Sequence, residues 1–344
     1  MESKGIRKPL PAIILGIVIA VAALCAVFLP GRQGERTETK EMPRESRVGF
    51  ALDTVITMTA YTDQPELLEE GLAECARYEK LLSRTVEGSD VWRINHAEGQ
   101  PTEVSAETAE ILREAIRVGK LSEGCFDVTI APASMLWDFT SGEAVLPDAG
   151  ALAEAAGRID YRLIRLEDSR VTVPAGMMID LGGIAKGYIA DKVKEYLEKR
   201  GIQSAILSFG GNVVGIGTKP DGSPWRVGIQ DIDAARGNSM MVVTNTGAST
   251  VTSGIYERGF EADGVWYHHI LDPKTGWPVQ NELASVTILS ESSLEGDALS
   301  TAVFALGSEK GLALIESLEG TEAILISRDR SVTMSSGAAA YVTQ

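Results

Sequence analysis

The sequence predicts an α+β fold, in which amphipathic helices alternate with short strands. The chain has 344 residues, of which 44% are apolar, and its mean hydropathy is near zero. These values are typical of a globular protein with a sizeable core. Apolar residues recur at helical spacing in some segments and alternate with polar residues in others. Helices interspersed with antiparallel-looking hairpins favour the α+β class.

The first thirty residues differ in composition from the rest of the chain. Residues 10–29 carry no charge and follow Lys4, Arg7 and Lys8, so they are long enough for a membrane-spanning helix. A cleaved signal peptide is the alternative, but the run is long for a signal core and no clean cleavage site closes it. The basic flank favours a cytoplasmic N-terminus. We therefore expect a cytoplasmic tail (1–9), a transmembrane anchor or signal segment (10–29), a flexible stalk (30–46) and a membrane-anchored extracytoplasmic domain (47–344).

Charge and cysteine content narrow the function classes. Residues 1–40 hold six basic and three acidic side chains, so the remainder carries 26 Lys and Arg against 45 Asp and Glu, a net charge of −19. Such a body would repel nucleic acid, and no nucleic-acid partner is expected. Cys25, Cys75 and Cys125 show no metal-binding spacing. Buried thiols are expected at Cys75 and Cys125, although an extracytoplasmic location would permit a disulfide.

The first half of the domain combines strands and helices. Residues 50–61 (FALDTVITMTAY) alternate and are β-branched, which predicts one strand. Residues 65–82 follow a helical pattern, and residues 105–124 form a second amphipathic helix that stops at Gly124. The other expected segments are an apolar, partly extended stretch (125–139), a short helix (148–159) and a hairpin turning at 167–169 (161–180).

The second half begins with a helix and continues with short strands. The helix starts near Gly183 and ends at Gly201, and a glycine pair at 210–211 in the next strand segment (204–217) is typical of a turn. A helix over GDALSTAVF (296–304), a last helix (309–318) and two closing strands complete the chain. Between these helical regions, short strands are expected at residues 225–230, 241–244, 250–256, 266–271 and 283–289.

The segment IDLGGIAKGYIADK (179–192) is the first candidate for chemistry. Asp180 ends a strand pattern, two glycines follow, and Lys186 lies in the first turn of a helix. Glycines let a ligand approach the backbone, and a helix N-terminus attracts phosphate. The spacing matches no nucleotide-binding motif. A tight strand-to-helix turn without a ligand therefore remains the alternative.

The segment GDALST (296–301) is the second candidate. Asp297 and Thr301 are four residues apart, so they share one helical face near the helix N-terminus. A carboxylate and a hydroxyl one turn apart suit a hard cation such as Mg²⁺. The alternative is that Asp297 caps the helix and Thr301 packs within it.

The segment YHHILDPKTGWPV (267–279) holds two of the three histidines. His268 and His269 alternate along an expected strand and therefore point to opposite faces, so that one could face a site. No H-x-x-x-H spacing or cysteine partner supports zinc.

Taken together, the segments above resemble the ApbE family of flavin transferases, which are FAD:protein FMN transferases. The resemblance runs from about residue 48 to residue 342. The motifs, in order, are LDTVIT, LLSRTVEGSDVWRIN, GCFDVTIAPASMLWDF, IDLGGIAKGYIADKV, LSFGGNVVGIG, TSGIYERGF, YHHILDPKTGWPV and GDALSTAVFALG. The resemblance implies an α+β fold of the tunnelling-fold kind. It also implies Mg²⁺-dependent transfer of FMN from FAD to a Thr or Ser hydroxyl of an acceptor protein, with release of AMP.

The resemblance also implies site residues at the matching positions. The metal ligands correspond to Asp297 and Thr301, with backbone help from Ser300 and Gly183. His269 matches the family's functionally important histidine and would accept a proton as general base. The expected acceptors are extracytoplasmic flavoproteins with FMN-binding domains, as in membrane redox complexes. Flavin-binding positions correspond to Leu52, Cys125, Phe126, Asp127, Asp180, Lys186 and Ile270.

The sequence departs from the family pattern at two positions. Thr85 stands where an aromatic residue usually follows SR, and Ile255 replaces the usual Asp of SGDYER. These changes put part of the cofactor contact and the acceptor positioning in question. The alternatives are an Mg²⁺-dependent FAD diphosphatase that gives FMN and AMP, and a flavin-binding envelope protein without turnover.

Overall fold

The computed structural model describes residues 42–141 and 143–343. The expected tail, the anchor and most of the stalk lie outside these residues. Within the described residues, no helix combines the length and the apolar character needed to cross a bilayer.

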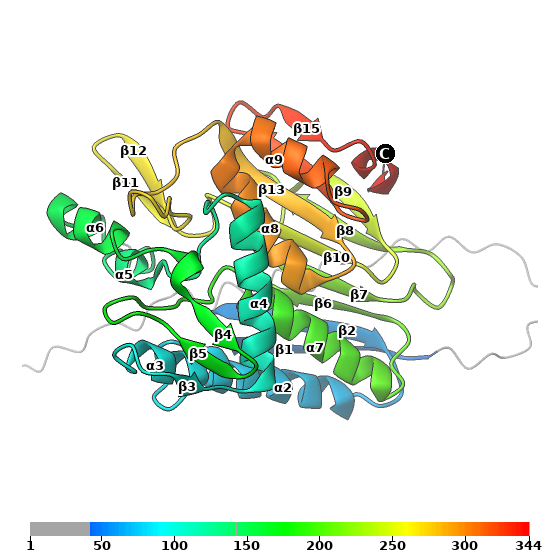
Figure 1. The fold of residues 1–344 in the computed structure, drawn as a ribbon. Coiled ribbons are helices and arrows are strands. Elements are labelled where there is room, and N and C mark those ends of the chain that lie inside the picture. Colours follow the sequence, from blue (N-terminus) through cyan, green and yellow to red (C-terminus); the bar gives the residue numbers. More distant parts are fainter. Residues whose placement is uncertain (1–41, 142, 344) are drawn as a thin grey trace, which may run out of the picture. The chain divides into compact units, whose positions relative to one another are not determined.

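An eight-stranded antiparallel sheet forms the centre of the domain (Figure 1). Hairpins connect β1 to β2, β6 to β7 and β14 to β15, while the other neighbours are distant in sequence. In spatial order the strands are β1 (Arg44–Ala51), β2 (Thr54–Tyr61), β6 (Ala205–Phe209), β7 (Asn212–Ile216), β10 (Ser249–Gly254), β13 (Leu283–Ser290), β14 (Glu322–Ser327) and β15 (Val332–Met334).

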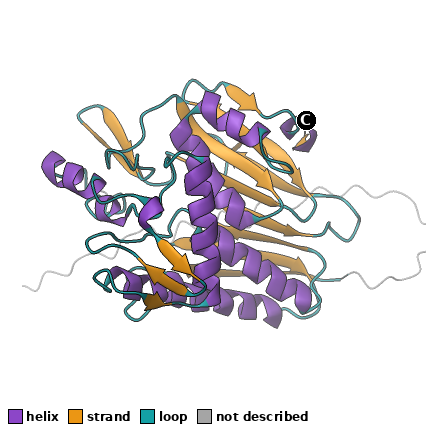
Figure 2. Cartoon of the chain, in the orientation of Figure 1, coloured by secondary structure: helices purple, strands orange, loops and turns teal. Residues whose placement is uncertain are grey.

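Helices cover one face of this sheet, and a small sheet covers part of the other (Figure 2). All eight residues of β13 are buried, which fits its place between two layers. The small sheet packs Val227, Ile229 and Val243 against Ile324 and Ile326 of β14. Its strands are β8 (Trp225–Gln230), β9 (Ser239–Asn245) and β16 (Val342–Thr343). The helices are α2 (Glu66–Leu82), α4 (Ala106–Leu121), α7 (Ala185–Lys199), α8 (Ser293–Leu306) and α9 (Ser308–Glu316).

Smaller elements extend the domain beside the helical layer (Figure 1). Aromatic rings from β11, β12 and the loop after α5 pack into one cluster, which contains Trp137, Phe139, Phe260, Tyr267 and Trp277. A separate three-stranded sheet has the order β3-β5-β4. The bounds are α3 (Asp90–Asn95), β3 (Thr102–Glu103), α5 (Ala131–Ser134), α6 (Ala149–Ala156), η2 (Tyr161–Leu163), β4 (Arg165–Glu167), β5 (Arg170–Thr172), β11 (Gly259–Ala262), β12 (Val265–His268) and η3 (Ala338–Tyr341).

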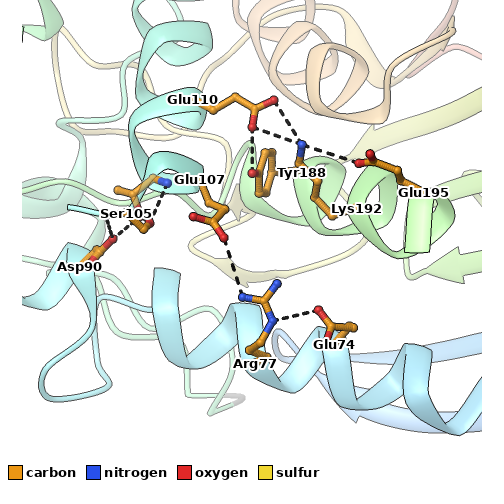
Figure 3. A network of polar contacts seen from close by, with 10 residues as sticks. Glu74, Arg77, Asp90, Ser105, Glu107, Glu110, Tyr188, Lys192 and Glu195 are labelled. Carbon is orange, nitrogen blue, oxygen red and sulfur yellow. Dashed lines mark hydrogen bonds and ion pairs between the residues drawn. The ribbon is translucent and has the colours of Figure 1, made fainter. Parts of the chain in front are cut away.

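Polar contacts hold α2, α4 and α7 together at the rim of the helical layer (Figure 3). The hydroxyl of buried Tyr188 donates to Glu110 at 2.9 Å, and Lys192 lies 3.2 Å from the same carboxylate. Arg77 of α2 bonds Glu74 of the same helix at 2.8 Å and lies 3.9 Å from the carboxylate of Glu107 on α4. Because exposed ion pairs contribute little, the main effect of the network is to satisfy the buried Tyr188 hydroxyl and to orient α4 on α7.

Most of the expected helices and hairpins are confirmed, but the first strand is wrong. Residues 50–61 are not one strand but the end of β1, a turn and the whole of β2, because Leu52 and Asp53 both adopt a left-handed backbone with φ of 57° and 55°. Such turns normally carry Gly or Asn, so the Leu-Asp pair gave no turn signal. Residues 44–46, expected to be flexible stalk, are the first residues of β1. Cys75 is a buried free thiol, as expected, whereas Cys125 is free but only partly buried.

Candidate active site

The candidate site lies where the N-terminal half of α8 crosses the N-terminus of α7. Gly187 is in the first turn of α7, and a Cβ at this position would lie 2.0 Å from the carbonyl oxygen of Ser293. Only glycine therefore allows the two helices to approach this closely. The crossing brings the glycine turn before α7 next to Asp297 and Thr301 of α8.

Asp297 joins the two helices. Its side chain is buried, its Oδ2 accepts a hydrogen bond from Gly187 N at 2.9 Å, and its Oδ1 lies 3.5 Å from Lys186 Nζ. The α8 helix has a cap of its own, because Ser292 Oγ accepts from Glu295 N. The alternative that Asp297 caps its own helix is therefore wrong. Asp297 caps α7 instead, and its Oδ1 is left facing the ammonium group of Lys186.

Thr301 lies one turn after Asp297 on the same face of α8. A Cβ at Gly183 would lie 3.6 Å from Thr301 Oγ1, so this glycine leaves the backbone open beside the hydroxyl. Ser300 is buried, and its hydroxyl donates to Asp297 O at 2.8 Å and contacts Ser253 Oγ at 2.7 Å. The fold thus brings together the four residues that were expected to bind the metal. Because the Ser300 hydroxyl already has these partners, only the backbone of Ser300 is left to contact a metal.

Asp180 orders the glycine turn that leads into α7. Its Oδ2 accepts hydrogen bonds from Arg84 Nε and Ser134 Oγ, both at 3.1 Å, and its Oδ1 accepts from Gly182 N at 2.8 Å. Lys186 Nζ donates to Gly182 O at 3.3 Å. Lys186 therefore lies between this turn and Asp297, and Asp180 and Lys186 both stand at the entrance to α7.

His268 and His269 use their ring nitrogens differently. His268 is fully buried, with Nε2 3.0 Å from Val279 O and Nδ1 3.3 Å from Ile270 N, so both nitrogens have protein partners. His269 is partly exposed, and its Nδ1 lies 3.2 Å from Arg258 O. Because a carbonyl can only accept, Nδ1 of His269 must carry the proton. Its Nε2 is then an unprotonated acceptor.

Although part of the His269 side chain reaches solvent, burial of the ring among protein atoms lowers its pKa to about 4. The neighbouring ring of His268 and the positive charges of Arg258 and Lys186 lower this pKa further. Burial likewise lowers the pKa of His268 to about 4. Both rings are therefore neutral at pH 7, and only His269 combines a neutral ring with a free acceptor nitrogen.

The loop at residues 125–127 packs against the glycine turn. A Cβ at Gly183 would lie 3.3 Å from the ring of buried Phe126. The carboxylate of Asp127 accepts from Thr129 N, Thr129 Oγ1 and Tyr161 N, and burial raises its pKa. The Asp127 side chain therefore holds the loop in place, and only its backbone is left for the expected flavin contact.

The tip of the β1–β2 hairpin is connected to His269 through Arg258. Leu52 N donates to Glu79 Oε1 at 2.9 Å, and the carbonyl of Asp53 accepts from Arg258 Nη2 at 3.1 Å. The carbonyl of Arg258 in turn holds His269. Strained left-handed residues such as Leu52 cluster at functional sites. Ile270, the other expected flavin contact in this region, is buried directly after His269.

A cavity of about 780 Å³ continues the Asp297–Thr301 face of α8. Ala305, four residues after Thr301, lines this cavity, and so does Cys125, whose pKa burial raises. The wall carries charge of both signs, from Lys274 and Lys310 and from Asp272, Glu282 and Glu309. The volume lies within the range of cofactor pockets, about 300–1,000 Å³.

Comparisons with known proteins place the chain in a family. Residues 52–325 match the ApbE family. The chain belongs to the ApbE family. It is 34% identical to a Treponema pallidum protein named FAD:protein FMN transferase, over 93% of each chain. It is 35% identical to a Klebsiella pneumoniae protein of the same name, over 82% of this chain and 88% of the relative. The crystal structure of the ApbE protein from Thermotoga maritima has a TM-score of 0.81 at 29% identity and covers 88% of this chain and 100% of its own.

The two departures from the ApbE pattern lie in different environments. Thr85 is exposed and its Oγ1 contacts Ser83 Oγ at 3.0 Å, so it adds no ring to the site. Ile255 packs against the main core, and its carbonyl accepts from Trp266 Nε1 at 3.0 Å. A partly buried aliphatic residue there is compatible with the fold.

Sequence reasoning missed several residues that position the site of this ApbE-family chain. They act through contacts between segments far apart in sequence, which no local pattern reports. Four of them lay within quoted motifs, and Arg84 stood directly beside the noted departure at Thr85, so these had a signal, whereas Glu79 had none. The missed residues are Glu79, Arg84, Ser134, Gly187 and Asp191.

Proposed function

We propose that the protein transfers FMN from FAD to a Thr or Ser hydroxyl of an acceptor protein and releases AMP. The observation that carries this proposal is the meeting of an oxygen-rich face, Asp297 and Thr301, with the cation of Lys186. His269 would add a neutral ring with a free acceptor nitrogen. Oxygen ligands, a cation and a proton acceptor are the groups that phosphoryl transfer requires. Relatives named FAD:protein FMN transferase support the choice of substrate.

The residues present fit a magnesium ion. Asp297 Oδ1 has only the long contact to Lys186, and Gly183 leaves open the space beside Thr301 Oγ1. Mg²⁺ takes few protein ligands and keeps waters or substrate phosphates as the rest. We propose Asp297 and Thr301 as side-chain ligands, aided by the backbone of Ser300 and Gly183. Bound there, Mg²⁺ would neutralise negative charge on the pyrophosphate.

Residues of this chain can accept the proton of the acceptor hydroxyl and stabilise the negative charge on the phosphate oxygens. In the proposed reaction, the acceptor oxygen forms a bond to the FMN phosphorus while the bond from that phosphorus to the AMP oxygen breaks. Nε2 of His269 accepts the hydroxyl proton, since Nδ1 is held by the Arg258 carbonyl. AMP leaves as a phosphate anion and needs no proton at that moment. Lys186 stabilises the negative charge that collects on the phosphate oxygens.

We propose that FAD occupies the cavity beside Cys125. The cavity meets the Asp297 face through Ala305, which would bring the pyrophosphate near the proposed cation. We propose flavin-binding roles for Leu52, Cys125, Phe126, Asp127, Asp180, Lys186 and Ile270. We also propose that residues 10–29 anchor the protein in the membrane, that the domain is extracytoplasmic, and that the acceptors belong to membrane redox complexes.

Mass spectrometry of an acceptor tests the transfer. The full chain in detergent is incubated with FAD, Mg²⁺ and a domain carrying an acceptor Thr. We expect an FMN-sized mass gain on the acceptor and one AMP for each modified molecule, and no gain in EDTA. Free FMN and AMP in equal amounts, without a mass gain, would establish the diphosphatase instead. FAD binding without AMP would indicate a flavin-binding protein without turnover.

A further inference from the structure

We infer that Asp191 is a positioning residue for the proposed cation site, because it fixes the register of α8 on α7. Asp191 lies in the middle of α7 and its carboxylate accepts three hydrogen bonds from the start of α8. Oδ2 accepts from Ser292 Oγ and Leu294 N, and Oδ1 accepts from Ser293 N, each at 2.9 Å. A helix N-terminus leaves such amides unpaired, so Asp191 completes the first turn of α8.

Asp191 and Asp297 form a reciprocal pair. Asp297 of α8 accepts from Gly187 N in the first turn of α7, while Asp191 of α7 accepts from the first turn of α8. Gly187 and Asp191 are four residues apart, and so are Ser293 and Asp297, which places each pair on one face of its helix. Two contacts of this kind fix both the rotation and the sliding of α8 along α7.

The contact between Asp297 and Gly187 determines which carboxylate oxygen of Asp297 is free to face a cation. Because Gly187 N occupies Oδ2, Oδ1 is the oxygen that faces Lys186. Asp297 and Thr301 move with α8, whereas Gly183 and Lys186 belong to α7 and the turn before it. Loss of the Asp191 contacts would therefore displace the two halves of the proposed site relative to each other. Residues that orient metal ligands in this way commonly change metal affinity by about 10–100-fold when they are replaced.

Cation binding tests this inference, which depends on the metal site of the proposed function. Mn²⁺ is titrated into the full chain in the presence of FAD, and the EPR signal of free Mn²⁺ reports binding. Asp191→Asn is expected to weaken Mn²⁺ binding about 10–100-fold, with helical content by circular dichroism retained. Ser292→Ala removes one of the three bonds, together with the cap that Ser292 Oγ provides for Glu295 N, and should weaken binding in the same direction by a smaller factor.

Asp90 provides a matched control. Its buried carboxylate also holds the start of another helix, α4, through Ser105 N and Thr108 Oγ1, both at 2.7 Å (Figure 3). Its other hydrogen-bond partner is Arg93 of its own helix, α3. Asp90→Asn should lower thermal stability and leave Mn²⁺ affinity unchanged. Equal Mn²⁺ affinity in Asp191→Asn and the wild type, or an equal loss in Asp90→Asn, would overturn the inference. Unchanged binding in Asp297→Asn would instead remove the proposed metal site itself.

Discussion

At the scale of residues, two adjacent histidines have different roles because their ring nitrogens have different partners. His268 has a protein partner at each nitrogen and packs edge-on against Phe304. His269 has one partner, the carbonyl of Arg258, and its other nitrogen is left as an acceptor. Sequence alternation predicted that the two rings diverge, but it could not say which of them faces a site. The hydrogen bonds decide that point.

Replacing His269 is expected to affect turnover more than binding. His269→Gln removes the proposed proton acceptor, so kcat should fall by about 10²–10⁴-fold. FAD affinity, measured by flavin fluorescence quenching, should change little. His268→Gln should instead lower the melting temperature, because a buried ring with two hydrogen bonds is disturbed. A variant of His269 with normal kcat would exclude it as the general base.

The pH dependence follows from the lowered pKa values of the same two residues. The pKa of each folded-state ring, about 4, lies below the usual value of 6.5. Between these values the unfolded chain binds more protons, so stability should rise with pH from about 4 to 6.5. NMR of the histidine Cε1 protons should show that both rings stay neutral at pH 5.5. The spectra of His268→Gln and His269→Gln would assign each signal to its residue. A titration midpoint near pH 6.5 for His269 would show that burial does not keep this ring neutral.

At the scale of elements, the α7–α8 crossing determines the site. The glycine turn, the first turn of α7 and the Asp297 face of α8 are all placed by this single contact. The sequence predicted both helices and the shared face of Asp297 and Thr301 from local spacing. It could not predict that Asp297 caps the neighbouring helix, because the partner amide of Gly187 is 110 residues away. Predictable features were local, and missed features depended on tertiary contacts.

Widening the crossing should damage both stability and activity. Gly187→Ala would place a methyl group against the Ser293 carbonyl and Asp297 Cβ, and overpacking of this kind destabilises by about 1–3 kcal/mol or more. Gly157→Ala is the control, since its new Cβ would meet neighbours at ordinary distances of 3.4 Å or more. In urea unfolding, Gly187→Ala should have a lower midpoint concentration than Gly157→Ala. Equal midpoints would show that the helices can move apart without loss.

At the scale of the whole molecule, the boundary of the folded domain differs from the expected one. The ApbE match begins at residue 52, and we expected the domain to begin at residue 47. The structure includes β1 from Arg44, paired with β2 along eight residues, and Thr62 N donates to Pro43 O. The alternating polar residues of β1 resembled a stalk because one face of this edge strand is exposed. Edge strands carry weak burial signals, so the boundary could not be read from the sequence alone.

Residues 10–29 are expected to anchor the protein. The full chain should sediment with membranes and resist alkaline carbonate extraction, because a span of twenty uncharged residues is sufficient for insertion. A chain that begins at residue 42 and is secreted through a separate signal should remain soluble. Recovery of the full-length gene product as a soluble chain with a new N-terminus after residue 29 would show cleavage instead.

Truncation at the two candidate boundaries should give different outcomes. A chain that begins at residue 42 keeps β1 and should retain its melting temperature and its FMN transfer. A chain that begins at residue 52 keeps the whole ApbE match but loses β1, including the contact of Gly49 with Leu72 of α2. It exposes the unpaired edge of β2, which favours aggregation. It also disturbs the Leu52–Asp53 turn that Arg258 connects to His269. We therefore expect lower solubility, and reduced kcat in the soluble fraction. Equal stability and activity of the two truncated chains would show that β1 is dispensable for the site.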